Sequence, residues 1–206
     1  MSSTVVVAVS QRVDAWPERG ERRDAVDQRL MAFLHAAGTV PVAVPNSFSG
    51  SADVLTGWAA AIKPRAILLS GGNDIGECPE RDATERWLLD HAKTHALPVL
   101  GVCRGMQMMA VWTGGALMQV EGHVRTRHVL AVAPGETGLP SEVNSYHNLA
   151  LADCPPGFVV MARAEDGTIE AMRHERLPWE GWMWHPEREP VLSPADIARI
   201  KVLFRV

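Results

Sequence analysis

Cys103 lies between Gly101 and Gly105 in the segment Gly-Val-Cys-Arg-Gly. Apolar residues 97–100 come directly before this segment, and the helix-like residues 106–112 follow it. Glycine two residues on either side of a nucleophile is typical of a strained strand-to-helix turn, which leaves no room for larger side chains. At the first turn of a helix, unpaired N–H groups and the positive dipole end favour thiolate over thiol. The spacing therefore predicts that Cys103 is a nucleophile.

A cysteine nucleophile needs a base to take its proton and a third group that orients the base. His185 is the candidate base, and Glu187 follows it in the sequence Trp-His-Pro-Glu. Proline after His185 restricts that residue to extended geometry, so the His-x-Glu spacing can hold the carboxylate beside the imidazole. Backbone N–H groups must also stabilise a tetrahedral oxyanion. Gly71 and Gly72, after another apolar run, are expected to expose such groups beside the cysteine.

The elements that must position these residues follow an alternating pattern. Short Val/Ile/Leu runs alternate with helix-like segments in the first half, which predicts a parallel sheet covered on both faces. Later strand candidates are short and bounded by Gly and Pro, which predicts an antiparallel extension within a single domain, residues 1–206. The predicted strands are residues 4–9, 40–44, 66–70, 98–102, 116–120, 128–132, 157–163, 168–173 and 181–184. The predicted helices are residues 23–37, 52–61, 83–95 and a last one from Pro194, with Ser193 as N-cap.

Composition excludes several classes of protein. The 206 residues carry a net charge of −4, and no basic tract suggests binding to nucleic acid or a membrane surface. Residues 5–9 are apolar but too few for the core of a signal peptide, so we expect a cytoplasmic protein. The three cysteines are too scattered for a disulfide framework.

Several motifs occur together and in one order: Gly-Gly-x-Asp at residues 71–74, Gly-x-Cys-x-Gly followed by Gln107, and a closing His-Pro-Glu. In this combination the chain resembles the class I glutamine amidotransferase superfamily. Within it, the chain is most similar to the free-standing γ-glutamyl hydrolases of the peptidase C26 type, such as γ-glutamyl-γ-aminobutyrate hydrolases. Three details favour that branch: Cys-Arg-Gly at the turn, the Arg-Asp-x-x-Glu segment at residues 81–85, and Asn-Ser-Tyr-His-Asn at residues 144–148.

The resemblance implies a three-layer, flavodoxin-like α/β fold and a reaction that releases glutamate from a γ-glutamyl amide. Cys103 would form a glutamyl thioester, His185 would protonate the leaving amine and then activate water, and Glu187 would orient His185. The backbone N–H groups of Gly72 and Arg104 would form the oxyanion hole. The residues that resemble substrate-binding positions are Gly71, Arg81, Asp82, Glu85, Gln107, Ser145, Tyr146 and His147. A structural role for His147 is an equal alternative.

The chain also departs from this family in the short segment between Asp74 and Arg81. A shorter loop would leave the mouth of the site more open, which favours a bulky leaving group such as a nucleotide-linked or sugar-linked amide. Ser10, Gln11 and Arg12 follow the first strand at the same sheet edge and could contact that group. We expect no cofactor. We also expect no metal, because His123 and His128 lack the i, i+4 spacing of a helical zinc pair.

Two alternatives to a free hydrolase remain. The chain could be a glutaminase subunit that passes ammonia to a partner synthase, or a non-catalytic relative that keeps the fold and a reactive cysteine. For the hydrolase, the expected partner is a small γ-glutamyl molecule, and association into a homodimer is left open. Turnover in the absence of any partner separates the hydrolase from the subunit.

Overall fold

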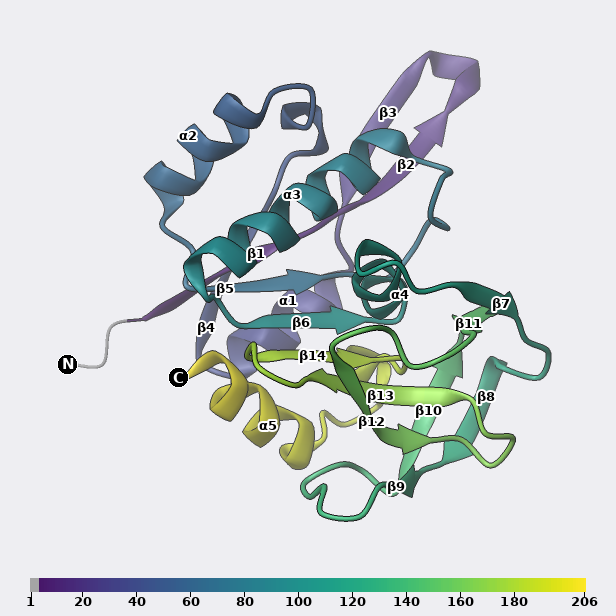
Figure 1. Cartoon of the computed structure of the whole chain (residues 1–206). Coiled ribbons are helices and arrows are strands. Elements are labelled where there is room, and N and C mark those ends of the chain that lie inside the picture. The colour runs from purple at the N-terminus through teal and green to yellow at the C-terminus, as the bar shows by residue number, and fades with distance from the viewer. Residues whose placement is uncertain (1–3) are drawn as a thin grey trace.

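The core of the computed structural model, which describes residues 4–206, is an eight-stranded sheet in the order β4-β1-β5-β6-β14-β13-β12-β9 (Figure 1). Neighbouring strands are parallel from β4 to β14 and antiparallel from β14 to β9. The parallel strands are β4 (Thr39–Ala43), β1 (Val5–Val9), β5 (Ala66–Leu69), β6 (Val99–Val102) and β14 (Trp179–Trp182). The remaining strands are β13 (Ile169–His174), β12 (Phe158–Arg163) and β9 (Ala131–Val132).

Helices cover both faces of the sheet, because successive side chains of a buried strand point to opposite sides. Val7 of β1 packs with α1 and α5 on one face, whereas Ala8 packs with α2, α3 and α4 on the other (Figure 1). This arrangement confirms the predicted mostly parallel α/β fold with helices on both faces. The helices are α1 (Gln28–Ala36), α2 (Ala52–Ile62), α3 (Pro79–His95), α4 (Arg104–Trp112) and α5 (Pro194–Phe204).

Three two-stranded antiparallel sheets complete the strand pairings of the described residues. Two of them lie at the antiparallel end of the molecule, as expected, and the third is a hairpin near the start of the chain (Figure 1). The pairs are β7 (Leu117–Gln119) with β11 (Leu149–Leu151), β8 (Val124–Val129) with β10 (Glu142–Tyr146), and β2 (Arg12–Trp16) with β3 (Glu21–Ala25). Short 3-10 helices are η1 (Pro17–Arg19), η2 (Asn46–Phe48) and η3 (Pro186–Arg188).

The hairpin corrects the prediction of a helix over residues 23–37. Residues 21–25 form β3 instead, and Gly20 with a φ of 62° allows the chain to turn back from β2. The helix α1 begins at Gln28, where the side chain of Asp27 accepts a hydrogen bond from the N–H of Arg29. The charged residues 21–24 also suit a solvated helix start, which hides this boundary in the sequence.

Other element boundaries also differ from those predicted. The helix α3 begins at Pro79 instead of residue 83, and the predicted strand 181–184 lies at Trp179–Trp182. The predicted strand 128–132 is divided between β8 and β9, while β10 and β11 had not been predicted at all. The last helix does begin at Pro194, and Ser193 caps it by accepting a hydrogen bond from the N–H of Asp196. No helix in residues 4–206 combines the length and apolar character needed to cross a membrane.

The turn between β6 and α4 depends on two close backbone approaches. A Cβ added at Gly105 would overlap the carbonyl oxygen of Leu69, and one at Gly101 would lie 2.6 Å from the carbonyl carbon of Gly105. Real Cβ atoms are not found so close to backbone atoms, so the strands and α4 can only pack in this way with glycine at both positions. The Gly-x-Cys-x-Gly pattern is thus a packing requirement of the turn.

Gly105→Ala is therefore expected to lower the free energy of unfolding by about 3 kcal/mol, the upper end of the range typical of overpacked cores. Gly57→Ala, in α2, is the matched control because nothing lies within 4 Å of its added Cβ. Alanine is a better helix former than glycine, so Gly57→Ala should stabilise by about 0.5–1 kcal/mol. Urea unfolding measures both, and similar midpoints for the two variants would contradict the packing argument.

Candidate active site

Cys103 occupies a strained position between β6 and α4. Its φ is 51° and its ψ is −107°, a conformation that residues other than glycine rarely adopt. Its N–H donates to the carbonyl of Trp182 at 2.7 Å, which ties the turn to the neighbouring strand β14. The strained turn places the side chain above the first turn of α4, where the N–H groups have no helical acceptors. This is the geometry that the Gly-x-Cys-x-Gly pattern predicted.

His185 lies just beyond β14, and both its ring and its backbone are held in place. Its Nδ1 is 2.7 Å from Oε1 of Glu187, which η3 places beside the ring. The side-chain amide of Asn144 forms two hydrogen bonds with the backbone of His185. It donates to the carbonyl oxygen at 2.8 Å and accepts from the N–H at 3.0 Å. A Cβ added at Gly71 would lie 2.7 Å from Cε1 of the imidazole. The ring therefore has one orientation, with Nε2 left for Cys103.

The environment of His185 favours its charged form. Burial alone lowers the pKa of an imidazole, but hydrogen bonds with Cys103 and Glu187 and the charges of both outweigh that effect. Together they raise the pKa of His185 to about 9. An imidazolium beside the thiol stabilises the thiolate, as an activated cysteine nucleophile requires.

Arg81 supports the loop that follows β5. Its Nη2 donates to the carbonyl of Ser70 at 2.7 Å and to the carbonyl of Gly71 at 3.0 Å. In a planar trans peptide the N–H points away from the C=O, so holding the Gly71 carbonyl turns the N–H of Gly72 away from α3. Gly72 itself has a φ of 97°, which favours glycine. Arg81 thus orients one of the two predicted oxyanion donors.

A buried group of charges holds Arg81 in place. Glu85 is fully buried and accepts from Arg81 through one oxygen, at 3.1 Å, and from Arg104 through the other. Arg104 also pairs with Asp82 and donates to the carbonyl of Asn73 at 2.8 Å. This cluster, Arg81, Asp82, Glu85 and Arg104, therefore joins α3, the start of α4 and the loop after β5.

A cavity of about 270 Å³ lies beside Gly71, Gly72 and His185. Its remaining lining comes mainly from the hairpin, the start of α1 and η3, and it carries charges of both signs. Apart from His185 and Glu187, the charged or titratable lining residues are Arg12, Asp14, Asp27 and Arg188. A second cavity of about 630 Å³ shares Arg12 and runs along the hairpin past Trp16 and Arg22.

Two predicted substrate contacts are compatible with the observed geometry and stay predictions. The ring of Tyr146 stands edge-on to His185 at 5.9 Å between centroids and is partly exposed. Gln107 donates to the carbonyl of Leu149 at 2.8 Å, while its Oε1 is buried without a partner among the described residues. That oxygen is free to accept a hydrogen bond from a ligand.

Other predicted substrate contacts also stay predictions, but in the structure the side chains concerned are engaged elsewhere. The guanidinium of Arg81 is fully buried against the loop and Glu85, so the side chains of both residues already have partners within the protein. The hydroxyl of Ser145 donates to the carbonyl of His123 at 2.7 Å, away from His185. His147 is buried beside Glu170, with its Nε2 3.4 Å from the carboxylate, which supports the structural alternative.

The expected contacts of residues 10–12 with a leaving group are corrected in part. The hydroxyl of Ser10 is buried and donates to Glu85 at 2.8 Å, and the side chain of Gln11 donates to the carbonyl of Val44 at 2.9 Å. Of these three, Arg12 lines the cavity.

Sequence reasoning missed several residues that build the site. Asp14, Asp27 and Arg188 line the cavity, and Asn144 holds the backbone of His185. Arg188 directly follows His-Pro-Glu, so its place in the sequence was a usable signal. Residues 23–27 had been assigned to a helix, which concealed their proximity to the loop that contains Gly71 and Gly72.

Comparison with known proteins places the chain in a family. The peptidase C26 family matches residues 5–187. The chain belongs to the peptidase C26 family. It is therefore a glutamine amidotransferase-like C–N hydrolase, as the motifs predicted.

Relatives with different reactions resemble the chain to a similar extent. It is 34% identical over 144 residues to a glutamine-hydrolyzing GMP synthase subunit of Thermococcus kodakarensis, covering 68% of this chain and 74% of that protein. It is 31% identical over 141 residues to γ-glutamyl-CDP-amidate hydrolase of Campylobacter jejuni, covering 66% and 68%. A crystal structure of a protein provisionally assigned as a GMP synthase subunit, from Thermoplasma acidophilum, has the same fold, with a TM-score of 0.75, 22% identity and coverage of 100% and 96%.

The pairing of His185 with Glu187 gives a testable dependence on pH. Because the pKa of His185 is raised from 6.5 to about 9, its charge stabilises the fold fully below pH 6.5, and this contribution is lost as the pH rises through about 9. In Glu187→Gln the pKa should fall, since the carboxylate that stabilises the imidazolium is gone. NMR titration of the His185 ring measures the shift. The exposed Glu165→Gln is the control, and an unchanged titration in Glu187→Gln would contradict the assignment.

Proposed function

We propose that the chain hydrolyses a γ-glutamyl amide bond through a thioester on Cys103. The observation that carries the proposal is the arrangement of Cys103, His185 and Glu187: a strained turn presents the thiol, and a buried imidazole lies between thiol and carboxylate. A thiolate paired with an imidazolium is a nucleophile and a general acid at once.

In the proposed reaction, Sγ of Cys103 attacks the γ-carbonyl carbon and forms a C–S bond. The C–N bond then breaks, and the leaving amine takes the proton from Nε2 of His185. Water next attacks the thioester while His185 accepts its proton, the C–S bond breaks, and glutamate leaves. Glu187 keeps the ring oriented and stabilises its charge in both half-reactions.

The oxyanion of each tetrahedral intermediate would lie between the N–H groups of Gly72 and Arg104. Within residues 4–206 neither N–H has a hydrogen-bond acceptor in the structure, so both are available to a ligand. Arg81 is a positioning residue in this scheme, because it holds the peptide that carries the Gly72 N–H. Donors that need no reorganisation are the effective ones in such a site.

The two cavities favour different parts of the substrate. The smaller one, with Asp27 and Arg188 beside His185, matches the ammonium and carboxylate at the α-carbon of a glutamyl group. The larger one continues from Arg12, which pairs with Asp14, to Trp16 and Arg22, and it is also lined by Glu18 and Glu77. Its indole and its two guanidinium groups suit an aromatic or sugar group that carries phosphate. We therefore propose a bulky, anionic leaving group such as a nucleotide-linked amide. The resemblance to a γ-glutamyl-CDP-amidate hydrolase supports this choice.

A glutaminase subunit is the second candidate, because the 34% identity to a glutamine-hydrolyzing GMP synthase subunit supports it. In that case the leaving group is ammonia, and a synthase partner would bind over the site. The two candidates differ in whether the isolated chain turns over: a subunit should be nearly inert with glutamine until its partner is present.

The thioester can be trapped on one residue. Intact mass spectrometry after acid quenching during turnover should show a γ-glutamyl adduct on the wild type and on Cys154→Ala, whose exposed cysteine is the matched control. Cys103→Ala should show no adduct and lose at least about 10³-fold in kcat/KM. An adduct on Cys103→Ala, or activity close to that of the wild type, would rule the mechanism out.

The leaving-group site can be tested at Arg12. With a phosphate-bearing γ-glutamyl conjugate, Arg12→Ala should raise KM about tenfold and leave kcat unchanged, since one charge-assisted hydrogen bond contributes about 1.5 kcal/mol. Arg163→Ala, exposed on β12 and outside both cavities, is the control and should change neither constant. A clear preference of the wild type for γ-glutamyl-γ-aminobutyrate over bulky conjugates would refute the assignment.

A further inference from the structure

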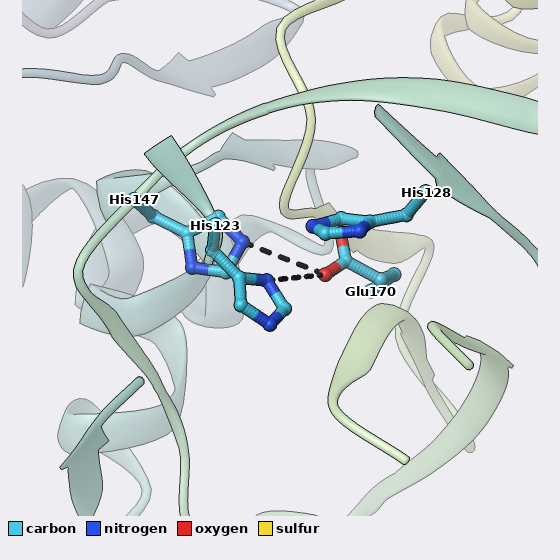
Figure 2. A group of neighbouring side chains, drawn as sticks. All are labelled: His123, His128, His147 and Glu170. Atoms are coloured by element: carbon cyan, nitrogen blue, oxygen red, sulfur yellow. Dashed lines mark ion pairs between the residues drawn. The ribbon is translucent and has the colours of Figure 1, made fainter. Parts of the chain in front are cut away.

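Four side chains from separate segments converge behind the small β8–β10 sheet (Figure 2). His123 precedes β8, His128 lies within it, His147 lies between β10 and β11, and Glu170 belongs to β13. Each offers one nitrogen or oxygen atom, and these four atoms all lie within 4.8 Å of one another. None of these four residues has a part in the reaction proposed above.

The atoms that face the centre of this cluster lack partners. His123 Nδ1, His128 Nε2, His147 Nε2 and both oxygens of Glu170 are buried without a hydrogen bond among the described residues. His123, His147 and Glu170 are themselves at most 3% exposed. An unpaired buried polar group costs about 1–3 kcal/mol, and more for a charged one, so five such atoms in one place require an explanation.

The outer nitrogens of two of the imidazoles are engaged. His123 Nε2 is 2.8 Å from Oδ2 of Asp166, and His147 Nδ1 is 3.1 Å from the carbonyl oxygen of Leu149. Both acceptors require an N–H, which leaves a lone pair on the inner nitrogen of each neutral ring. A carboxylate or carbonyl behind a histidine is the arrangement that orients metal-binding imidazoles.

Two inward lone pairs that face a carboxylate repel it unless a cation lies between them. His123 Nδ1 is 3.7 Å from Oε1 of Glu170, and His147 Nε2 is 3.4 Å from the same oxygen (Figure 2). Ligand atoms about 2.0–2.1 Å from a tetrahedral zinc ion are about 3.4 Å apart. The cluster is thus close to the size that a bound zinc ion needs.

We propose that His123, His128, His147 and Glu170 bind a zinc ion with a structural role. Three imidazoles and one carboxylate suit zinc, whereas magnesium and calcium prefer oxygen ligands. Four protein ligands fill a tetrahedral coordination shell, and the burial of the cluster leaves no open position for a substrate. The prediction of no metal rested on helical spacing, which does not apply to ligands from separate segments of the chain.

The ion would join the β8–β10 sheet to β13 of the central sheet. Asn144, whose side chain is hydrogen-bonded to the backbone of His185, lies in β10. The hydroxyl of Ser145, the next residue of β10, donates a hydrogen bond to the carbonyl of His123. This bond already connects the strand to one of the proposed zinc ligands. The metal therefore supports the segment that positions His185, without contact with the reacting atoms.

The experiment measures zinc in protein purified without a histidine tag and without chelator. Mass spectrometry of the metal content should give about one zinc per chain, and equilibrium dialysis of stripped protein against zinc chloride should restore it. Glu170→Gln and His147→Gln should bind at least about tenfold more weakly, and the exposed Asp166→Asn about 10–100-fold more weakly through loss of the outer partner. His35→Gln and Asp153→Asn, both exposed and outside the cluster, are the matched controls.

Thermal unfolding gives an independent readout, since a ligand that binds only the folded state raises Tm. Added zinc should raise the Tm of stripped wild type and of both controls, and should raise it less in Asp166→Asn, which is not expected to disturb folding. Stripped wild type that takes up no zinc at micromolar concentration would overturn the proposal. The charge of Glu170 would then be balanced by protons on the cluster instead of a metal ion. Equal zinc affinity in Asp166→Asn and Asp153→Asn would overturn it as well.

Discussion

Glu85 accepts hydrogen bonds from two buried guanidinium groups, those of Arg81 and Arg104, and the geometry of the site depends on this pairing. Charges removed from water are tolerated only when paired, and removal of one partner leaves the others uncompensated. Arg81 donates hydrogen bonds to the loop after β5 that contains Gly71, and Arg104 belongs to the turn that carries Cys103. Cys103, the proposed nucleophile, and Gly72, a proposed oxyanion donor, follow different strands, and the arginines beside them share one carboxylate.

The parts of the site that could be predicted are those whose reasons are local. Gly101 and Gly105 are required by contacts within a few residues of the turn and one neighbouring strand, so their spacing predicts the position of Cys103. His185 and Glu187 are two residues apart and meet directly. The parallel sheet was predictable for the same reason, because each buried strand is a short apolar run followed by its own helix.

The parts that could not be predicted depend on contacts between distant segments. Arg81 was expected at the substrate, but its partners at Ser70 and Gly71 become visible only when α3 packs against β5. Residues 23–25 of the hairpin were assigned to a helix because the charged residues 21–24 also suit a solvated helix start. The histidine cluster is the extreme case, since Glu170 lies 23 positions after His147 in the sequence and no spacing rule connects them.

The confinement of His185 has a consequence for the order of events in the proposed reaction. Glu187 holds one edge of the ring and Gly71 leaves no space beside Cε1, so the imidazole cannot turn over between half-reactions. The departing amine and the incoming water must then use the same nitrogen, one after the other. While the amine stays, the thioester can only return to the original amide. Escape of the amine into solvent is therefore the step that commits the acyl group to water, and an amine at high concentration competes with water for the same place.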